Sequence, residues 1–297
     1  MGFWKNSTEP KITPFSSYNI LKHKITINPL DVLLWNGRHS GRDIVNIYSK
    51  FGPMMQVGAD TKMLNFGLWK NSTALPDAQR EMSEYASEFG EFGSAKKILD
   101  VGSGFCIPAT IWKEKFSHLD IFCMDLNFLE LKNGSNQVIS QINSSSGDIP
   151  FSDKSFDRII ALESAQHFVL EKFFDESRRI LTDDGKLILA IPVTLDPSLF
   201  KLGILSITWL SKKYTRFHVL EVIRQSGFRL KKEKSVGELV YAPFANYYIQ
   251  NRKALKERLD STYSGNIEGL VFKSMKKMKN LSERKIIDYL FLSLEKA

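Results

Sequence analysis

The feature that most constrains the fold of this chain is a short apolar run that ends in an acidic residue and two glycines. Residues 98–104 read Ile-Leu-Asp-Val-Gly-Ser-Gly, and a helix-compatible segment follows. Glycines here let the backbone turn sharply out of a buried strand and approach a ligand closely. A second acidic residue, Asp125, ends the next apolar run, at the distance where a carboxylate often binds a ribose. We therefore expect a nucleoside-containing cofactor on a doubly wound α/β sheet.

The glycine-rich loop also shows which cofactors it does not suit. The dinucleotide fingerprint G-x-G-x-x-G needs glycine at position 107, where this chain has Ile107. No segment matches the phosphate loop G-x-x-x-x-G-K-S/T. The D-x-G-x-G pattern of residues 100–104 instead resembles the first motif of class I S-adenosylmethionine-dependent methyltransferases. There a carboxylate and backbone groups hold the charged amino-acid end of the cofactor.

The composition is that of an ordinary globular protein. The 297 residues, 43% of them hydrophobic, suffice for one large α/β domain. The two cysteines, Cys106 and Cys123, form no disulfide framework and predict a reduced, cytoplasmic setting. The five histidines are scattered, so we expect no metal site. We attribute the net charge of +8 to surface lysines rather than to an anionic partner such as nucleic acid.

From residue 97 onward, strand-like and helix-like segments alternate. Apolar runs predict strands over residues 97–101, 120–124, 138–143, 157–162, 186–192, 228–239 and 285–294. Helical spacing and stop signals predict helices over residues 41–51, 77–89, 127–132, 169–181 and 217–225. Such alternation implies parallel βαβ units, whose ligands bind outside the carboxyl ends of the strands.

Further segments resemble the small-molecule methyltransferases that modify quinones, tocopherols, sterols and macrolide sugars. The matching segments are Asp125-Leu126-Asn127, residues 150–157 (PF-x-D-x-x-FD), residues 161–168 (ESxxHF), residues 179–187 (RvLkPGGxL), and residues 65–69 with Ala78-Gln79 (HyGyW…AQ). The match covers about residues 60–240 and the last strand. It implies a Rossmann-like, doubly wound, mostly parallel seven-stranded sheet with an antiparallel last strand, an N-terminal extension and helical lid insertions.

This resemblance also implies a domain organisation. An N-terminal extension or lid would cover residues 1–60, and the methyltransferase domain would cover residues 61–297. Lid insertions would lie at about residues 197–215 and 242–284. The segment from Leu199 to Leu210 is apolar, so a roof made of it predicts an apolar or lipid-like acceptor. The alternative is that this segment packs against the N-terminal extension.

The resemblance implies which residues hold S-adenosylmethionine. They are Asp100, Gly102, Ser103, Gly104, Asp125, Leu126, Asp148, Glu163, Trp69 and Gln79. Asp125 would bind the ribose, or would alternatively cap the helix that follows it. Asp148 is the carboxylate nearest to Ser145, which occupies the family's adenine-contact position. Trp69 would cover the sulfonium by cation–π contact, or would pack in the core.

Two departures from the family pattern concern the cofactor loops. Cys106 stands where the family usually has a third glycine, so we expect a side chain beside the glycine-rich loop. The chain between Asp125 and Pro150 is short, which leaves a stunted second helix.

His167 follows the fourth predicted strand and therefore lies at the ligand-binding edge. A neutral imidazole there can take a proton from a hydroxyl group that attacks the methyl group. Related sugar methyltransferases often add a second histidine, where this chain has Gln166, and an acidic residue after the fifth strand, where it has Ile191-Pro192. His167 is therefore either the base or a residue that positions the acceptor. Methyl transfer can also proceed by proximity and orientation alone.

Residues 267–281 have the pattern of a basic amphipathic helix. One face holds Ile267, Leu270, Val271, Met278 and Leu281, and the other holds Lys273, Lys276, Lys277 and Lys279. Such a helix can lie on an anionic membrane as a peripheral contact. We favour the alternative, in which the lysines form the solvated face of a packed helix.

Taken together, these patterns predict a cytoplasmic S-adenosylmethionine-dependent methyltransferase. Its acceptor would be a small, apolar or secondary-metabolite molecule, methylated at oxygen, with carbon or nitrogen as the alternative. A nucleic-acid methyltransferase is a rival, although residues 163–166 do not match the N/D-P-P-Y motif of enzymes that methylate base nitrogens. A non-catalytic, methyltransferase-like scaffold is a second rival, supported by Cys106 and by the missing partners of His167.

Overall fold

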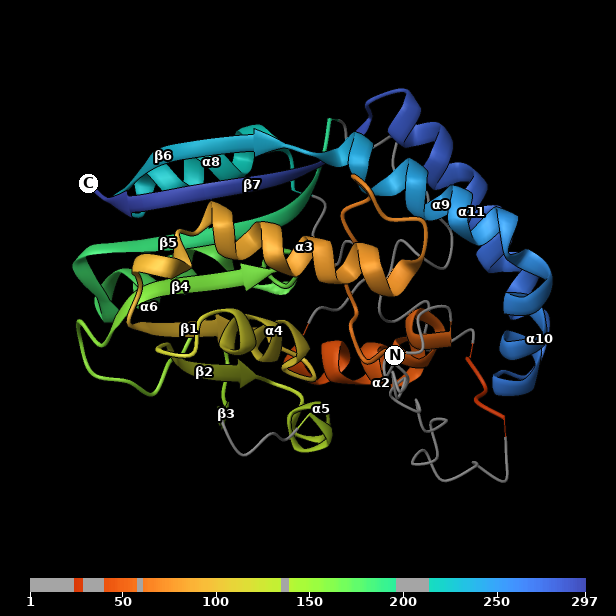
Figure 1. Ribbon diagram of the computed structural model, residues 1–297, viewed down its shortest axis with the longest axis horizontal. Coiled ribbons are helices and arrows are strands. Elements are labelled where there is room, and N and C mark those ends of the chain that lie inside the picture. Colours follow the sequence, from red (N-terminus) through yellow and green to blue (C-terminus); the bar gives the residue numbers. More distant parts are fainter. Residues whose placement is uncertain (1–23, 29–39, 58–60, 135–138, 196–213) are drawn as a thin grey trace, which may run out of the picture.

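The computed structural model describes residues 24–28, 40–57, 61–134, 139–195 and 214–297. The predicted apolar roof at residues 199–210 and most of the N-terminal extension lie outside the described residues. The strands form one seven-stranded sheet in the order β3-β2-β1-β4-β5-β7-β6 (Figure 1). They are β1 (Lys97–Val101), β2 (Asp120–Asp125), β3 (Ser140–Asn143), β4 (Phe156–Leu162), β5 (Leu181–Thr194), β6 (Phe228–Ser235) and β7 (Ile287–Lys296).

Strand directions confirm the predicted fold class. β1 pairs in parallel with β2 and β4, and β2–β3 and β4–β5 are parallel as well. The last strand, β7, inserts between β5 and β6 and runs antiparallel to both. The sheet is therefore mostly parallel with an antiparallel last strand.

Helices cover both faces of the sheet and its carboxyl edge. They are α2 (Gly41–Val57), α3 (Leu75–Phe89), α4 (Ile107–Lys115), α5 (Phe128–Asn133), α6 (Leu170–Ile180), α8 (Arg216–Gln225), α9 (Tyr241–Gln250), α10 (Arg252–Thr262) and α11 (Ile267–Glu283). α3 and α4 lie on one face, and α6 and α8 lie on the other (Figure 1). α2, α9, α10 and α11 lie beyond the carboxyl ends of the parallel strands (Figure 1).

Burial of the central strands explains why their sequences read as continuous apolar runs. Helices on both faces leave these strands no solvated side. One hydrophobic cluster joins the sheet to α3 and α4, through side chains such as Met82 and Trp112, and extends to α9–α11. A second cluster joins the opposite face to α6 and α8, through Phe173 and Val219.

Six of the seven strands have other bounds than predicted, and the differences are largest in β6 and β5. Residues 236–239 were expected to continue β6, but Gly237–Leu239 form a short 3₁₀ helix. Gly237 lies so close to β7 that a Cβ atom there would come 2.5 Å from Oδ1 of Asp288, which accepts a hydrogen bond from the Gly237 amide. In β5, Leu181 pairs with Phe156 and Lys186 with Arg158, so the predicted helix-stop residues 183–185 form a bulge within the strand.

β6 is an edge strand of the sheet, and its outer positions are charged. Arg229, Lys231, Lys232 and Lys234 are exposed along it. Some of these charges are paired within the sheet, because Arg229 and Lys231 both approach the carboxylate of Glu295.

α11 confirms the basic amphipathic pattern and shows what its apolar face contacts. Ile267, Val271, Met278 and Leu281 are buried in the core, whereas Leu270 is 48% exposed. Lys273, Lys276 and Lys277 face solvent. The apolar stripe is therefore used for packing, as the packed-helix alternative expects. None of the helices in the described ranges is both long and apolar enough to cross a bilayer.

The aromatic contacts of β7 give a test of the core. Phe291 is fully buried between Tyr85, Phe89 and Tyr289. We expect Phe291→Ala to lower the free energy of unfolding by about 3–5 kcal/mol, because it removes buried area and leaves a cavity. The control Phe217→Ala, on a side chain that is 78% exposed, should change it by less than about 0.5 kcal/mol. Urea unfolding followed by circular dichroism measures both; equal effects would contradict this description of the core.

Candidate active site

A cavity of about 450 Å³ opens at the carboxyl ends of β1, β2 and β4. The chain continues from β1 to β2 on one side of β1, whereas β4 lies on the other side. Loops that leave neighbouring strands in opposite directions open a crevice, where ligands of such sheets bind. The volume is within the range of small-molecule sites. The described part of its wall comes from the strand loops, from residues 62–66 and from α2.

The glycine-rich loop is fixed between β2 and β4. The amides of Gly102 and Ser103 donate to the carbonyl of Met124, at 2.7 and 3.2 Å. Gly102 has a φ of +76°, and a Cβ atom there would come 2.4 Å from Cβ of Ser164. Ser164 in turn donates a hydrogen bond of 2.6 Å to the carbonyl of Val101. Only glycine fits position 102, for both conformational and steric reasons.

Gly104 presents bare backbone to the cavity. Its φ is +52°, and a Cβ atom there would lie 3.5 Å from Oε2 of Glu130 and 3.8 Å from Cδ1 of Leu64. Both of these side chains line the cavity. A ligand can therefore approach the backbone between Glu130 and Leu64.

Cys106 does not face the cavity. It is fully buried and has a left-handed backbone, with φ 58°, directly before α4. Gln141 donates a hydrogen bond of 3.4 Å to its Sγ atom, beneath the loop. The side chain at this position therefore leaves the cavity open and does not support the non-catalytic alternative.

Asp125 ties two loops of the site together. Its Oδ2 atom accepts from the amide of Gly104, and its Oδ1 atom accepts from the amide of Asn127, both at 2.8 Å. The cap of α5 is Asn127, whose side chain accepts from the amides of Leu129 and Glu130. The alternative in which Asp125 is the helix cap is therefore wrong. Each carboxylate oxygen can still accept a second hydrogen bond from a ligand.

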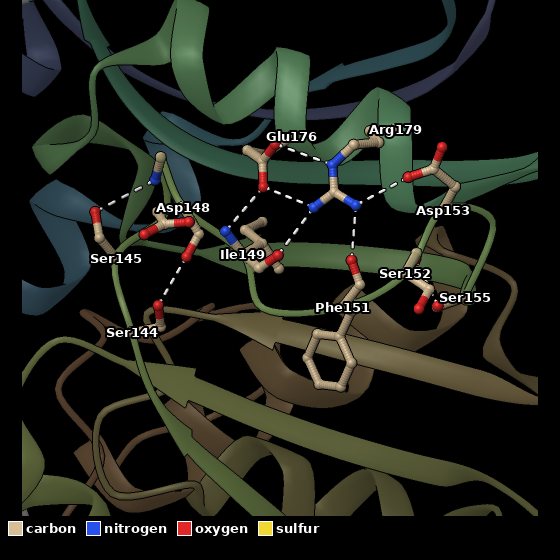
Figure 2. A network of polar contacts seen from close by, with 11 residues as sticks. Ser144, Ser145, Asp148, Ile149, Phe151, Ser152, Asp153, Ser155, Glu176 and Arg179 are labelled. Atoms are coloured by element: carbon tan, nitrogen blue, oxygen red, sulfur yellow. Dashed lines mark hydrogen bonds and ion pairs between the residues drawn. The ribbon is translucent and has the colours of Figure 1, made fainter.

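The loop that carries Asp148 is braced by a network of polar contacts (Figure 2). Arg179 on α6 donates to the carbonyls of Ile149 and Phe151, at 2.9 and 2.7 Å. It also pairs with Glu176, whose carboxylate accepts from the amide of Ile149. The guanidinium thus fixes the backbone next to Asp148, whose own side chain is exposed at the cavity.

Glu163 lies at the end of β4 in a strained, left-handed conformation with φ 55°. Its Oε2 atom accepts from the amide of Phe66 and from the hydroxyl of Tyr289, both at 3.3 Å. Strained residues of this kind are typical of functional sites. Removal from water raises the pKa of Glu163 to about 8.

Four of the five carboxyl groups in the described wall of the cavity have a raised pKa. Burial raises the pKa of Asp100, Asp125 and Glu130, to about 8 for Glu130. The lysines among the described lining residues are Lys62 and Lys172, and the Lys62 ammonium donates to the carbonyl of Asn133. A cationic ligand would compensate the cost of ionising these carboxyls.

Trp69 and Gln79 do not line the cavity. The indole N–H of Trp69 donates to the carbonyl of Phe66, and its ring packs beside Tyr247. Gln79 donates to the carbonyls of Met63 and Asn65. Both side chains therefore support, from behind, the segment that forms one wall of the cavity, and neither lies in the wall where the sequence analysis expected it.

His167 lies at the cavity and has a partner that the sequence analysis did not find. Its Nε2 atom is 2.7 Å from the hydroxyl oxygen of Tyr48 on α2. Four residues of α2 line the cavity at helical spacing: Gly41, Ile44, Val45 and Tyr48. This spacing was the sequence signal that could have pointed to α2 as part of the cavity wall. Glu130 was missed as well, because nothing in its local sequence distinguishes it from a surface residue.

The other predicted site residues line the cavity, whereas one of the two predicted lid insertions does not. Asp100, Gly102, Ser103, Gly104, Asp125, Leu126, Asp148, Glu163 and His167 all line the cavity. None of the described lining residues comes from the insertion at 242–284. Instead α10 packs against α2, and Tyr263 donates a hydrogen bond to the carbonyl of Lys50, so the insertion supports the wall that α2 forms.

Comparison with known proteins assigns this site. Residues 99–189, which carry the loops described above, match a family described as "Methyltransferase domain". These residues are a methyltransferase domain. The resemblance to class I S-adenosylmethionine-dependent methyltransferases is therefore confirmed, together with the enzyme class and its cofactor.

Individual relatives of this chain are distant. Erythromycin 3''-O-methyltransferase of Saccharopolyspora erythraea is 23% identical over 256 residues, which are 77% of this chain and 80% of the relative. The structure of mycolic acid cyclopropane synthase CmaA1 complexed with SAH and CTAB has a TM-score of 0.73 at 16% identity. The match covers 85% of this chain and 98% of the CmaA1 chain. The [4+2]-cyclase SpnF has a TM-score of 0.69 at 15% identity, and the match covers 86% of this chain and 97% of the SpnF chain. Both structures show the fold alone.

The residues of the methyltransferase's cavity fit S-adenosylmethionine. This cofactor carries a sulfonium and an ammonium group, and the cavity is lined by carboxyls whose pKa is raised by removal from water. It also carries a ribose, for which Asp125 keeps free acceptor capacity. Gly104 leaves room for a close approach to the loop.

The brace around Arg179 gives a test of loop positioning. We expect Arg179→Met to lower the free energy of unfolding by about 2 kcal/mol, because two backbone carbonyls and Glu176 lose their donor. The amides of Asp148 and Ile149 should exchange with deuterium faster than in the wild type. Arg224→Met, which removes an exposed pair with Glu221, should leave both quantities unchanged. Slow exchange of these amides in Arg179→Met would contradict the brace.

The raised pKa of Glu163 predicts how stability depends on pH. The folded protein without cofactor holds this proton up to about pH 8, whereas the unfolded chain releases it near the ordinary pKa of 4.5. The stability that this bound proton contributes to the folded protein is therefore present at low pH, and it is lost as the pH rises from about 4.5 to about 8. We expect Glu163→Gln to raise the melting temperature more at pH 8.5 than at pH 6. A gain for Glu163→Gln that is the same at both pH values would contradict the assignment.

Proposed function

We propose that the protein methylates a hydroxyl group of a small, apolar acceptor, with S-adenosylmethionine as the methyl donor. One observation carries this proposal: the cofactor loops and the Tyr48–His167 pair line the same cavity. S-adenosylmethionine supplies, when bound, an electrophilic methyl group on a sulfonium. The residues of the chain have to bind it, to orient the acceptor and to receive a proton.

On the cofactor side, we assign each carboxyl a role by its position. Asp125, beside Gly104, would accept from the ribose hydroxyls, and Asp148 would face the adenine. Asp100 and Glu163, at the ends of β1 and β4, would face the cationic end of the cofactor. Gly102 and Ser103 would approach it through their backbone, and Leu126 would pack against it. Trp69 and Gln79 would act indirectly, through the wall segment that they support.

On the acceptor side, the described wall is mainly apolar. α2 contributes Ile44, Val45 and Met55, and the loop after β4 contributes Phe168 and Val169. Apolar pockets with a few polar groups select an apolar ligand and fix its orientation through those groups. Here the polar groups are His167 and Tyr48, which suit a hydroxyl.

The proton chemistry and the named activity of one relative both support oxygen as the accepting atom. A hydroxyl has to lose its proton when it gains a methyl group, and His167 is placed to receive it. The relative with 80% coverage is an O-methyltransferase by name. Methylation of carbon or nitrogen is the alternative outcome of the experiment below.

A calorimetric titration tests the cofactor assignment. We expect S-adenosylmethionine to bind the wild type and to bind Asp125→Ala at least about tenfold more weakly, because hydrogen bonds to a charged group are lost. Asp120→Ala, at the opposite, exposed end of β2, is the matched control and should bind as the wild type does. Equal affinities of all three proteins would overturn the ribose role of Asp125.

A methyl-transfer assay tests the acceptor assignment. The panel comprises a macrolide with free sugar hydroxyls, a prenylated hydroquinone and a long-chain alcohol, each incubated with methyl-deuterated cofactor. We expect mass spectrometry to find the label on oxygen of at least one of them. Label on carbon or nitrogen, or label on none of the three, would overturn this proposal.

A further inference from the structure

The Tyr48–His167 contact joins two parts of the chain that lie 119 residues apart. Tyr48 is on α2, and His167 follows β4. The rings meet edge to face, with centroids 5.3 Å apart, and both side chains line the cavity. The hydrogen bond of 2.7 Å joins two groups that can each donate or accept, so the positions of its proton and lone pair matter for the reaction.

Gln166 determines which tautomer of His167 is present. Its Nε2 atom donates a hydrogen bond of 2.7 Å to the carbonyl of Glu163, which can only accept. The amide nitrogen is therefore the atom that lies 3.3 Å from Nε2 of His167. An amide nitrogen can only donate, so the ring nitrogen accepts from it. The network thus assigns the proton of the neutral ring to Nδ1.

This tautomer fixes the direction of the bond to Tyr48. Since Nε2 of His167 is an acceptor, the Tyr48 hydroxyl at 2.7 Å donates to it, and the longer contact of Gln166, at 3.3 Å, shares the same lone pair. The basic nitrogen is therefore covered by Tyr48 and is not open to an acceptor molecule. The hydroxyl oxygen of Tyr48 keeps its own lone pairs, and Tyr48 lines the cavity.

We propose that Tyr48 is the group that takes the proton from the acceptor, while it passes its own proton to Nε2 of His167. This relay rests on the proposed O-methylation. As the acceptor oxygen bonds to the methyl carbon, the electron pair of the breaking carbon–sulfur bond stays on sulfur. The acceptor's proton moves to the Tyr48 oxygen and the Tyr48 proton moves to His167. The products are a methyl ether, a neutral thioether, a neutral tyrosine and an imidazolium.

The surroundings of Tyr48 favour a proton relay over a tyrosine that is already deprotonated before the reaction. Burial, together with Glu130, Glu163 and Asp125, raises the pKa of Tyr48 well above its ordinary value. The phenol therefore passes a proton only while it receives one. These carboxyls lie on α5, at the end of β4 and at the end of β2. In the ionised form that a bound cationic cofactor favours, they stabilise the imidazolium that forms.

Nitrogen NMR of the wild-type protein tests the relay without any acceptor. With ¹⁵N-labelled histidine, we expect the Nε2 signal of His167 to be that of an unprotonated nitrogen and the Nδ1 signal to be that of an N–H. A proton on Nε2 would overturn the relay, because the Tyr48 hydroxyl would then accept from the ring. This result is independent of the methyl-transfer assay, so failure of the relay and failure of the proposed function are distinguishable.

Kinetics of two Tyr48 variants test the proton path, with whichever acceptor of the panel is methylated. We expect Tyr48→Phe to lower kcat by a factor of about 10²–10⁴, the usual size of an acid–base contribution. An unchanged or higher kcat would overturn the relay, since removal of the hydroxyl uncovers Nε2. Tyr85→Phe, on α3 and outside the cavity wall described, is the matched control.

Incorporation of 3,5-difluorotyrosine at position 48 separates proton transfer from positioning. This side chain keeps the ring and the hydroxyl but is more acidic. A relay predicts a change in kcat of more than about threefold and an altered pH profile, as expected of a proton-transfer group. A purely positional hydroxyl predicts wild-type values for both, and that outcome would overturn the proposal.

Discussion

The reversal of strand order between β1 and β4 is the constraint on which the rest of this structure depends. Because the chain builds outward from these two strands in opposite directions, the loops at their carboxyl ends separate and leave a crevice. The crevice is lined with carboxyls that protein atoms remove from water, which raises their pKa values. A fold that holds such groups without a cation is less stable than it would be with one. The site is therefore prepared for a cationic ligand at some expense of stability.

Contacts from inside and outside residues 99–189 hold this crevice in shape. Asp125 joins the two cofactor loops, Arg179 fixes the backbone beside Asp148, and Gln79 supports the wall segment at residues 62–66. α10 and α11 contribute no lining residue among those described, but α10 packs on α2, which carries Tyr48. Residues from both ends of the chain thus position one hydroxyl group at the site.

The sequence predicted the sheet well because buried parallel strands are continuous apolar runs between helices. The first strand was predicted with its observed bounds, Lys97–Val101. β6 was predicted too long, because the close approach of Gly237 to Asp288 is a tertiary contact without a local signal. The cofactor loops were predictable because spacing along the chain defines them. The Tyr48–His167 pair was not, because it depends on how a helix far away in the sequence docks at the sheet.

The basic edge strand β6 has a consequence for how copies of this protein behave in solution. An edge strand exposes unpaired backbone groups that can pair with the edge of another molecule. The row formed by Arg229, Lys231, Lys232 and Lys234 would bring like charges together in such a pairing. Repulsion between two β6 edges thus explains why part of the net charge of +8 lies on this strand. These four basic side chains oppose the pairing of two molecules through their β6 edges.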